Sequence, residues 1–155
     1  MPNETYEQTS ERLDEELRSV RPKALPDFLD RHGEELIRSP HPFADYMRLK
    51  LKEKGVLRQN LFLAADLSEN YGYKLLEEEK HTRQRDAILR LCLAAAFQPR
   101  ELREALTLYG MAPLHARLPR DAVLLVAAHN GVYELREING LLERCGQEPL
   151  VKDYE

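Results

Sequence analysis

The segment Arg58–Asp86 has the sequence RQNLFLAADLSENYGYKLLEEEKHTRQRD, and its pattern predicts three consecutive helices. A short helix is expected over Arg58–Ala65. A second is expected over Glu69–Glu78 after a tight turn that ends at Ser68, because serine is a favourable N-cap residue. The third, over Arg83–Phe97, is apolar on most sides, so it is expected to be the buried centre of the fold.

The remaining sequence also has helical patterning. Valine, isoleucine and threonine are few, alternating apolar and polar runs are missing, and proline and glycine fall at segment edges. Further helices are expected over Thr5–Arg18, Leu25–Ile37, Pro42–Glu53, Arg100–Tyr109, Arg120–His129 and Tyr133–Cys145. The first of these has capping-box spacing between Thr5 and Gln8. The sequence therefore predicts an all-α protein.

The composition is that of a globular protein of ordinary size. The chain has 155 residues, of which 43% are apolar, enough to bury a substantial core. The longest apolar runs are far shorter than the roughly 20 residues that a membrane-spanning helix needs. The N-terminus is acidic and polar, unlike a secretory leader, so a cytoplasmic protein without a membrane partner is expected. Cys92 and Cys145 lie in apolar helical patterns and are expected to be buried thiols.

Charge is distributed unevenly along the chain. The net charge is −4, and residues 1–40 contain 10 acidic and 6 basic residues, whereas the rest contains 17 of each. We therefore expect an acidic two-helix arm over residues 1–40, packed on a single compact body over residues 41–150, with a tail at 151–155. A strongly basic domain, typical of tight nucleic-acid binders, is absent, but a local basic patch remains compatible with the sequence.

Signatures of catalysis are missing from the sequence. There is no glycine-rich phosphate loop, no GxSxG motif and no pair of metal-ligand residues at zinc-site spacing. The run Glu77–Glu79 cannot converge on one atom, because consecutive helical side chains point about 100° apart. We therefore expect no catalytic residue, no metal ligand and no cofactor, and we do not expect an enzyme.

Two short helices, a tight turn and a longer helix are typical of helix-turn-helix architecture. The segment resembles the XRE-type (Cro/repressor-like) helix-turn-helix family, specifically a bacterial branch with N- and C-terminal helical extensions. The match is carried by Tyr71, Tyr73, Lys74, Leu75, Leu76, Gln84, Arg85 and Asp86. Residues Tyr109–Gly131 and the ending INGLLERCGQEPL also look like the extension of these relatives. The resemblance covers about residues 41–150 and implies a five-helix repressor-like core, preceded by two helices and followed by a helical extension.

The resemblance implies a transcriptional regulator that binds duplex DNA. Asn70, Tyr73 and Lys74 are the candidates for contacts with base edges. Arg58, Lys80 and Arg83 are the candidates for contacts with phosphates. In the predicted helix Pro42–Glu53 and just beyond it, the basic residues Arg48, Lys50, Lys52 and Lys54 form either a solvated flank or a phosphate-facing patch. A homodimer is an open alternative, because related domains often dimerise to match successive major grooves.

Four glutamates favour a second interpretation, namely a protein-interaction adaptor that keeps the fold with weak or no DNA binding. Glu69, Glu77 and Glu79 would repel the phosphate backbone, Glu78 belongs to the same acidic run, and the acidic arm over residues 1–40 favours this interpretation as well. Such an adaptor would take a protein partner, for example in a protein kinase system. Tyr73 would then be an exposed anchor for that partner, because aromatic residues are common interface hot spots.

The segment also departs from the family pattern in its packing. Phe62 stands where a small residue is usual, and Gly72 stands where a branched aliphatic residue is usual. We interpret this as a reciprocal exchange that conserves core volume, which cores tolerate well. In addition, Glu78 stands where a left-handed glycine normally ends the second helix. The helix is therefore expected to run further or to end differently.

Overall fold

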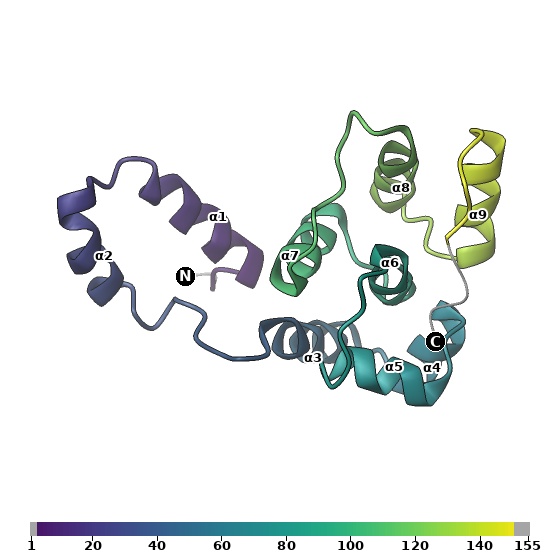
Figure 1. Cartoon of the computed structure of the whole chain (residues 1–155), viewed down its shortest axis with the longest axis horizontal. Helices are drawn as coiled ribbons and strands as arrows, with labels where there is room; N and C mark the ends of the chain where they lie inside the picture. The colour runs from purple at the N-terminus through teal and green to yellow at the C-terminus, as the bar shows by residue number, and fades with distance from the viewer. Residues whose placement is uncertain (1–2, 151–155) are drawn as a thin grey trace. The chain divides into compact units, whose positions relative to one another are not determined.

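The computed structural model describes residues 3–150, and all regular elements in this range are helices (Figure 1). They are α1 (Tyr6–Leu17), the 3-10 helix η1 (Pro22–Ala24), α2 (Leu25–Arg31), α3 (Pro42–Lys54), α4 (Arg58–Ala65), α5 (Glu69–Leu76), α6 (Arg85–Ala94), α7 (Pro99–Tyr109), α8 (Pro119–His129) and α9 (Leu135–Arg144). The all-α prediction is confirmed for these residues, whereas the predicted tail at 151–155 lies outside them. Within the described range, every helix is too short or too polar to cross a bilayer.

The chain divides between Pro40 and His41 into two compact units. We refer to the described residues 3–40 as the N-terminal unit and to residues 41–150 as the C-terminal unit.

In the N-terminal unit, α1 begins with the predicted capping box. The backbone N–H of Gln8 donates to Oγ1 of Thr5 at 3.1 Å, and the N–H of Thr5 donates to Oε1 of Gln8 at 2.9 Å. The second helix is shorter than predicted. It was expected to reach Ile37, but α2 (Leu25–Arg31) ends at Arg31 and turns follow it. This early end coincides with a polar network that binds the residues after α2 to α1.

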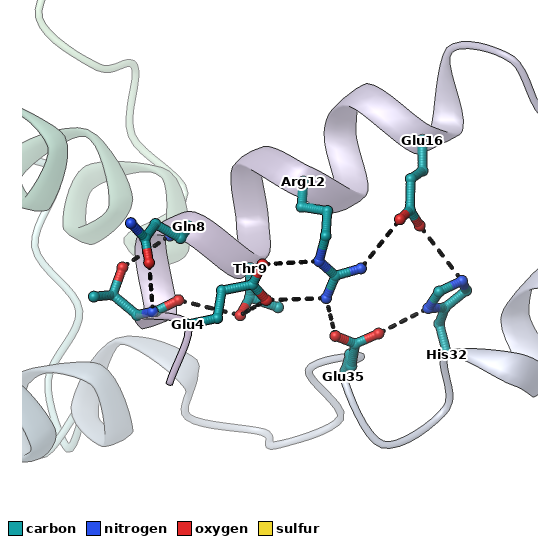
Figure 2. A network of polar contacts seen from close by, with 8 residues as sticks. Glu4, Gln8, Thr9, Arg12, Glu16, His32 and Glu35 are labelled. Atoms are coloured by element: carbon teal, nitrogen blue, oxygen red, sulfur yellow. Dashed lines mark hydrogen bonds and ion pairs between the residues drawn. The ribbon is translucent and has the colours of Figure 1, made fainter. Parts of the chain in front are cut away.

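Arg12 lies at the centre of this network (Figure 2). Its guanidinium forms ion pairs with Glu4 at 2.9 Å, with Glu16 at 3.3 Å and with Glu35. His32 lies between two of these carboxylates, 2.7 Å from Glu35 and 3.5 Å from Glu16. The hydrogen bonds of His32 and Arg12 hold the pKa of Glu35 below its ordinary value, and those of Arg12 and Thr9 do the same for the pKa of Glu4.

In the C-terminal unit, α6 is the buried centre, as predicted. All residues from Asp86 to Leu93 are buried, and α6 packs against α4, α7 and α9. The helix begins at Arg85, two residues later than predicted, because Oγ1 of Thr82 accepts a hydrogen bond from the N–H of Gln84 and forms a turn there. Cys92 is buried, and burial raises the pKa of its thiol. The prediction of a buried Cys145 was wrong, because this residue is the exposed C-cap of α9.

Candidate nucleic-acid interface

A turn of three residues, 66–68, joins α4 to α5. Asp66 ends α4 in the left-handed conformation with φ 54°, and the N–H of Leu67 donates to the carbonyl of Phe62 at 3.0 Å. Ser68 then caps α5, because its Oγ accepts the N–H of Tyr71 at 3.2 Å. The buried guanidinium of Arg90 on α6 donates to the carbonyl of Ala65 at 3.1 Å, which fixes the end of α4. The two helices are therefore held in one arrangement by local and tertiary contacts.

Where α4 packs on α5, a large side chain at position 62 faces the glycine at position 72, as predicted. An ideal Cβ built on Gly72 would lie 2.4 Å from Cδ1 of Phe62, so the phenyl ring occupies the space that a side chain at position 72 would need. Phe62 is 1% exposed and Tyr71 is 4% exposed. The prediction that Phe62 fills this space is therefore confirmed, and Tyr71 belongs to the core.

The outer face of α5 presents the predicted base-edge candidates. Asn70, Tyr73 and Lys74 are all exposed, together with Glu69. Tyr73 is 39% exposed, and its ring packs edge-on against the buried Phe62 ring at a centroid distance of 4.9 Å. An amide, a phenol and an ammonium group therefore share one accessible helix face.

Arg58 lies beside this face but is already paired. Its guanidinium lies 2.7 Å from Oε1 of Glu77, and the other oxygen of Glu77 lies 3.2 Å from the guanidinium of Arg48. The guanidinium of Arg58 also lies 5.6 Å from the centre of the Tyr73 ring. Glu77 thus bridges two arginines, and Arg58 would have to exchange this carboxylate for a phosphate in order to bind DNA.

Glu78 follows α5 and has a structural role that sequence patterns do not show. The helix ends at Leu76, earlier than predicted, and Glu78 adopts the left-handed conformation with φ 56° that glycine usually provides. Its carboxylate accepts the N–H of Ala44 at 2.9 Å, in the first turn of α3. The contact satisfies an unpaired helix donor and places negative charge at the positive end of α3.

The other two phosphate candidates lie in the connection between α5 and α6. Lys80 and Arg83 are exposed, and Nζ of Lys80 lies 4.9 Å from the centre of the Tyr71 ring. Between them, His81 stacks on Tyr109 with a centroid distance of 4.3 Å, and the N–H of Thr82 donates to the Tyr109 hydroxyl at 2.7 Å. This connection is therefore anchored to α7, which positions its two basic side chains.

The basic residues of α3 divide into two pairs. Lys50 and Lys54 both lie 2.8 Å from the carboxylate of Glu101 and are part of the internal structure. Arg48 and Lys52 instead line a shallow pocket of about 300 Å³ together with Arg58 and the apolar residues Val56 and Leu57, among others. The sequence grouped all four basic residues into one candidate patch, whereas in the structure only Arg48 and Lys52 line the pocket with Arg58.

The described residues contain no cluster of histidine, cysteine and acidic side chains that could hold a metal ion. Arg85 and Asp86, which carry part of the family resemblance, are used in packing. Arg85 forms an ion pair with Asp121, and Asp86 accepts two hydrogen bonds from Arg120 at 2.8 and 2.9 Å.

Comparison of the chain with models of protein families, with curated proteins and with solved structures gives no match.

Proposed function

We propose that residues 41–150 form a repressor-like helix-turn-helix domain that acts as a cytoplasmic, non-catalytic regulator by binding duplex DNA. In this proposal α5 enters the major groove and presents Asn70, Tyr73 and Lys74 to base edges. The observation that carries the proposal is the exposure of these three side chains on one face of a short, capped helix. Amide and ammonium groups on such a face have the chemistry that base edges and phosphates require.

The charges around α5 support contacts with the DNA backbone. Lys80 and Arg83 extend from the connection after α5, and Arg58 lies at the start of α4. Glu77 is turned toward Arg48 and Arg58, and Glu78 toward α3, so two of the four glutamates serve internal contacts. Glu69 and Glu79 remain exposed, and we expect them to keep the affinity modest.

Fluorescence anisotropy with random-sequence duplex DNA tests this proposal. With three phosphate contacts, the affinity is expected to fall roughly 40-fold as the salt concentration rises from about 50 to 200 mM. With two contacts, the same rise in salt is expected to lower the affinity only about 12-fold. We therefore expect Arg83→Ala to lower both the affinity and the salt dependence. The control is Arg103→Ala, which removes another exposed arginine, from α7. Absence of binding at the lower salt concentration, or equal effects of the two variants, would contradict the proposal.

A protein-interaction adaptor is the second candidate, and exposed leucines favour it. Leu63 on α4 is 81% exposed, and Leu57 just before α4 is 67% exposed. Apolar side chains with this exposure, at and before the helix whose Phe62 contacts Tyr73, are suited to a protein interface. If DNA does not bind at low salt, Leu63→Glu and Tyr73→Ala become the variants with which to search for a protein partner.

A further inference from the structure

A groove of about 630 Å³ runs along α1 in the N-terminal unit. One wall is a single face of α1, on which Leu13 and Leu17 recur one turn apart, and the other wall is formed by residues 34–37. Leu36 and Ile37 provide the apolar part of this second wall. The groove is therefore lined by aliphatic side chains from both sides.

The two walls are fixed to each other by the polar network described above (Figure 2). Arg12 of α1 binds Glu35 of the second wall, and His32 binds both Glu35 and Glu16. These contacts lie inside one unit and need no bound partner. The groove is thus a preformed feature of the N-terminal unit, which lowers the cost of binding.

The apolar side chains at the groove are only partly covered. Leu17 is 45% exposed and Ile37 is 49% exposed, although they belong to opposite walls. The 12 residues of α1 span about 18 Å, which is the length of roughly three helical turns. A helix with apolar residues at i, i+3, i+4 and i+7 has the size and pattern to cover both walls.

The charge of the rim determines which kind of helix fits. Asp14, Glu34 and Glu35 line the groove; Asp14 also pairs with Arg18 at 3.4 Å, and residues 1–40 have a net charge of −4. Such a rim repels nucleic acid and anionic lipid and attracts lysine and arginine. The lysine-rich helix α3 of a second copy does not fit this description, because its large apolar residues Phe43, Tyr46 and Met47 are buried in the core.

We propose that the groove between α1 and residues 34–37 is a docking site for a basic amphipathic helix of a protein partner. This inference is independent of DNA binding by the C-terminal unit. The aliphatic walls accept the apolar face of the helix, and Asp14 and Glu34 pair with the basic residues at its flanks.

The probe is a fluorescein-labelled peptide of about 14 residues, with leucines at helical i, i+3, i+4 and i+7 spacing and lysines elsewhere. A second peptide of equal charge has its leucines moved off this spacing. Titrated with the full chain, the first peptide is expected to bind at least about tenfold more tightly, because only its leucines form one face.

Substitutions separate docking in the groove from simple charge attraction. Leu17→Glu and Ile37→Glu add negative charge, so charge attraction alone predicts tighter binding, whereas docking in the groove predicts binding weakened by at least about tenfold. The matched control is Leu118→Glu, the same substitution at a leucine of the C-terminal unit that is 53% exposed, which is expected to leave peptide affinity unchanged. Circular dichroism melts confirm that the variants remain folded, and amide shifts in NMR spectra are expected to map binding to α1 and residues 34–37.

Three results would overturn the proposal. The first is the absence of binding of the amphipathic peptide, and the second is equal binding of both peptides. The third is an equal effect of Leu17→Glu and Leu118→Glu. Concentration-dependent self-association that competes with the peptide would instead assign the groove to a second copy of the chain.

Discussion

Replacement of Gly72 by alanine tests the packing that joins α4 to α5. The added Cβ would lie 2.4 Å from Cδ1 and 2.6 Å from Cε1 of Phe62, closer than real Cβ contacts. The Phe62 ring is 1% exposed and contacts Tyr73, so it cannot move aside without disturbing its neighbours. We therefore expect α5 to shift or the ring to leave its favoured rotamer, and either change lowers stability.

Two opposing effects set the size of this change. Alanine is favoured over glycine in a helix by about 1 kcal/mol, whereas overpacking of a core costs about 1–3 kcal/mol. Gly140→Ala is the matched control, because Gly140 lies in α9 and a Cβ there would meet nothing within 4 Å. We expect Gly140→Ala to raise the free energy of unfolding by about 0.5–1 kcal/mol. Gly72→Ala is expected to leave it unchanged or to lower it by up to about 2 kcal/mol.

Urea denaturation followed by far-ultraviolet circular dichroism measures both variants. The difference between their free energies of unfolding is the overpacking cost alone. A Phe62→Leu substitution added to Gly72→Ala provides a further test, since the smaller side chain vacates the space and the double variant is expected to be more stable than the sum of the single effects predicts. Equal stabilisation by the two alanine substitutions, or strict additivity with Phe62→Leu, would refute the packing argument.

Three further predictions concern polar contacts. Glu78→Ala removes the side-chain cap on α3 and keeps a non-glycine residue at positive φ, so it is expected to lower the free energy of unfolding by about 0.5–2 kcal/mol. Glu78→Gly also removes the cap but relieves the backbone strain, so it is expected to lower the free energy of unfolding by less in the same urea assay. Asp86→Asn weakens a largely buried pair of hydrogen bonds and is expected to cost about 1–2 kcal/mol in thermal or urea unfolding. Arg12→Gln is expected to raise the pKa of Glu4 more than that of Glu35 in an NMR titration, because Arg12 is the main cause of the shift only for Glu4. Since both pKa values are lowered in the folded chain, these carboxylates stabilise it above their unfolded pKa of about 4.3, and the contribution is lost as the pH falls through the folded values.

Local signals predicted the helices whose ends are determined by their own sequence. The bounds of α4 were predicted correctly, and so was the start of α5, because Ser68 provides a cap that depends only on neighbouring residues. The end of α2 was predicted too late, and at this point His32 and Glu35 contact residues of α1 that are far away in the sequence. Helical periodicity does not contain information about such contacts.

The candidate interface shows the same distinction. Exposure of Asn70, Tyr73 and Lys74 follows from helical periodicity once the buried positions of α5 are known. The ion pair of Arg58 with Glu77 does not follow from periodicity. Glu77 reaches Arg58 and Arg48 only in the folded unit, because the three residues belong to different parts of the chain. Thus the sequence can predict which side chains face outward, but it cannot predict which outward charges are neutralised by a neighbour.

This neutralisation decides how the glutamates of the segment bear on function. The sequence of this segment contains four glutamates that would repel an anionic ligand. In the structure, however, Glu77 pairs with two arginines and Glu78 caps α3. Within residues 69–84 the exposed charges that remain are Lys74, Lys80 and Arg83 against Glu69 and Glu79. A surface so nearly balanced gives weak affinity for the DNA backbone, so discrimination would have to come from base edges. Binding of random DNA at low salt is therefore the most demanding test of the DNA-binding proposal, because it depends on this small excess of positive charge alone.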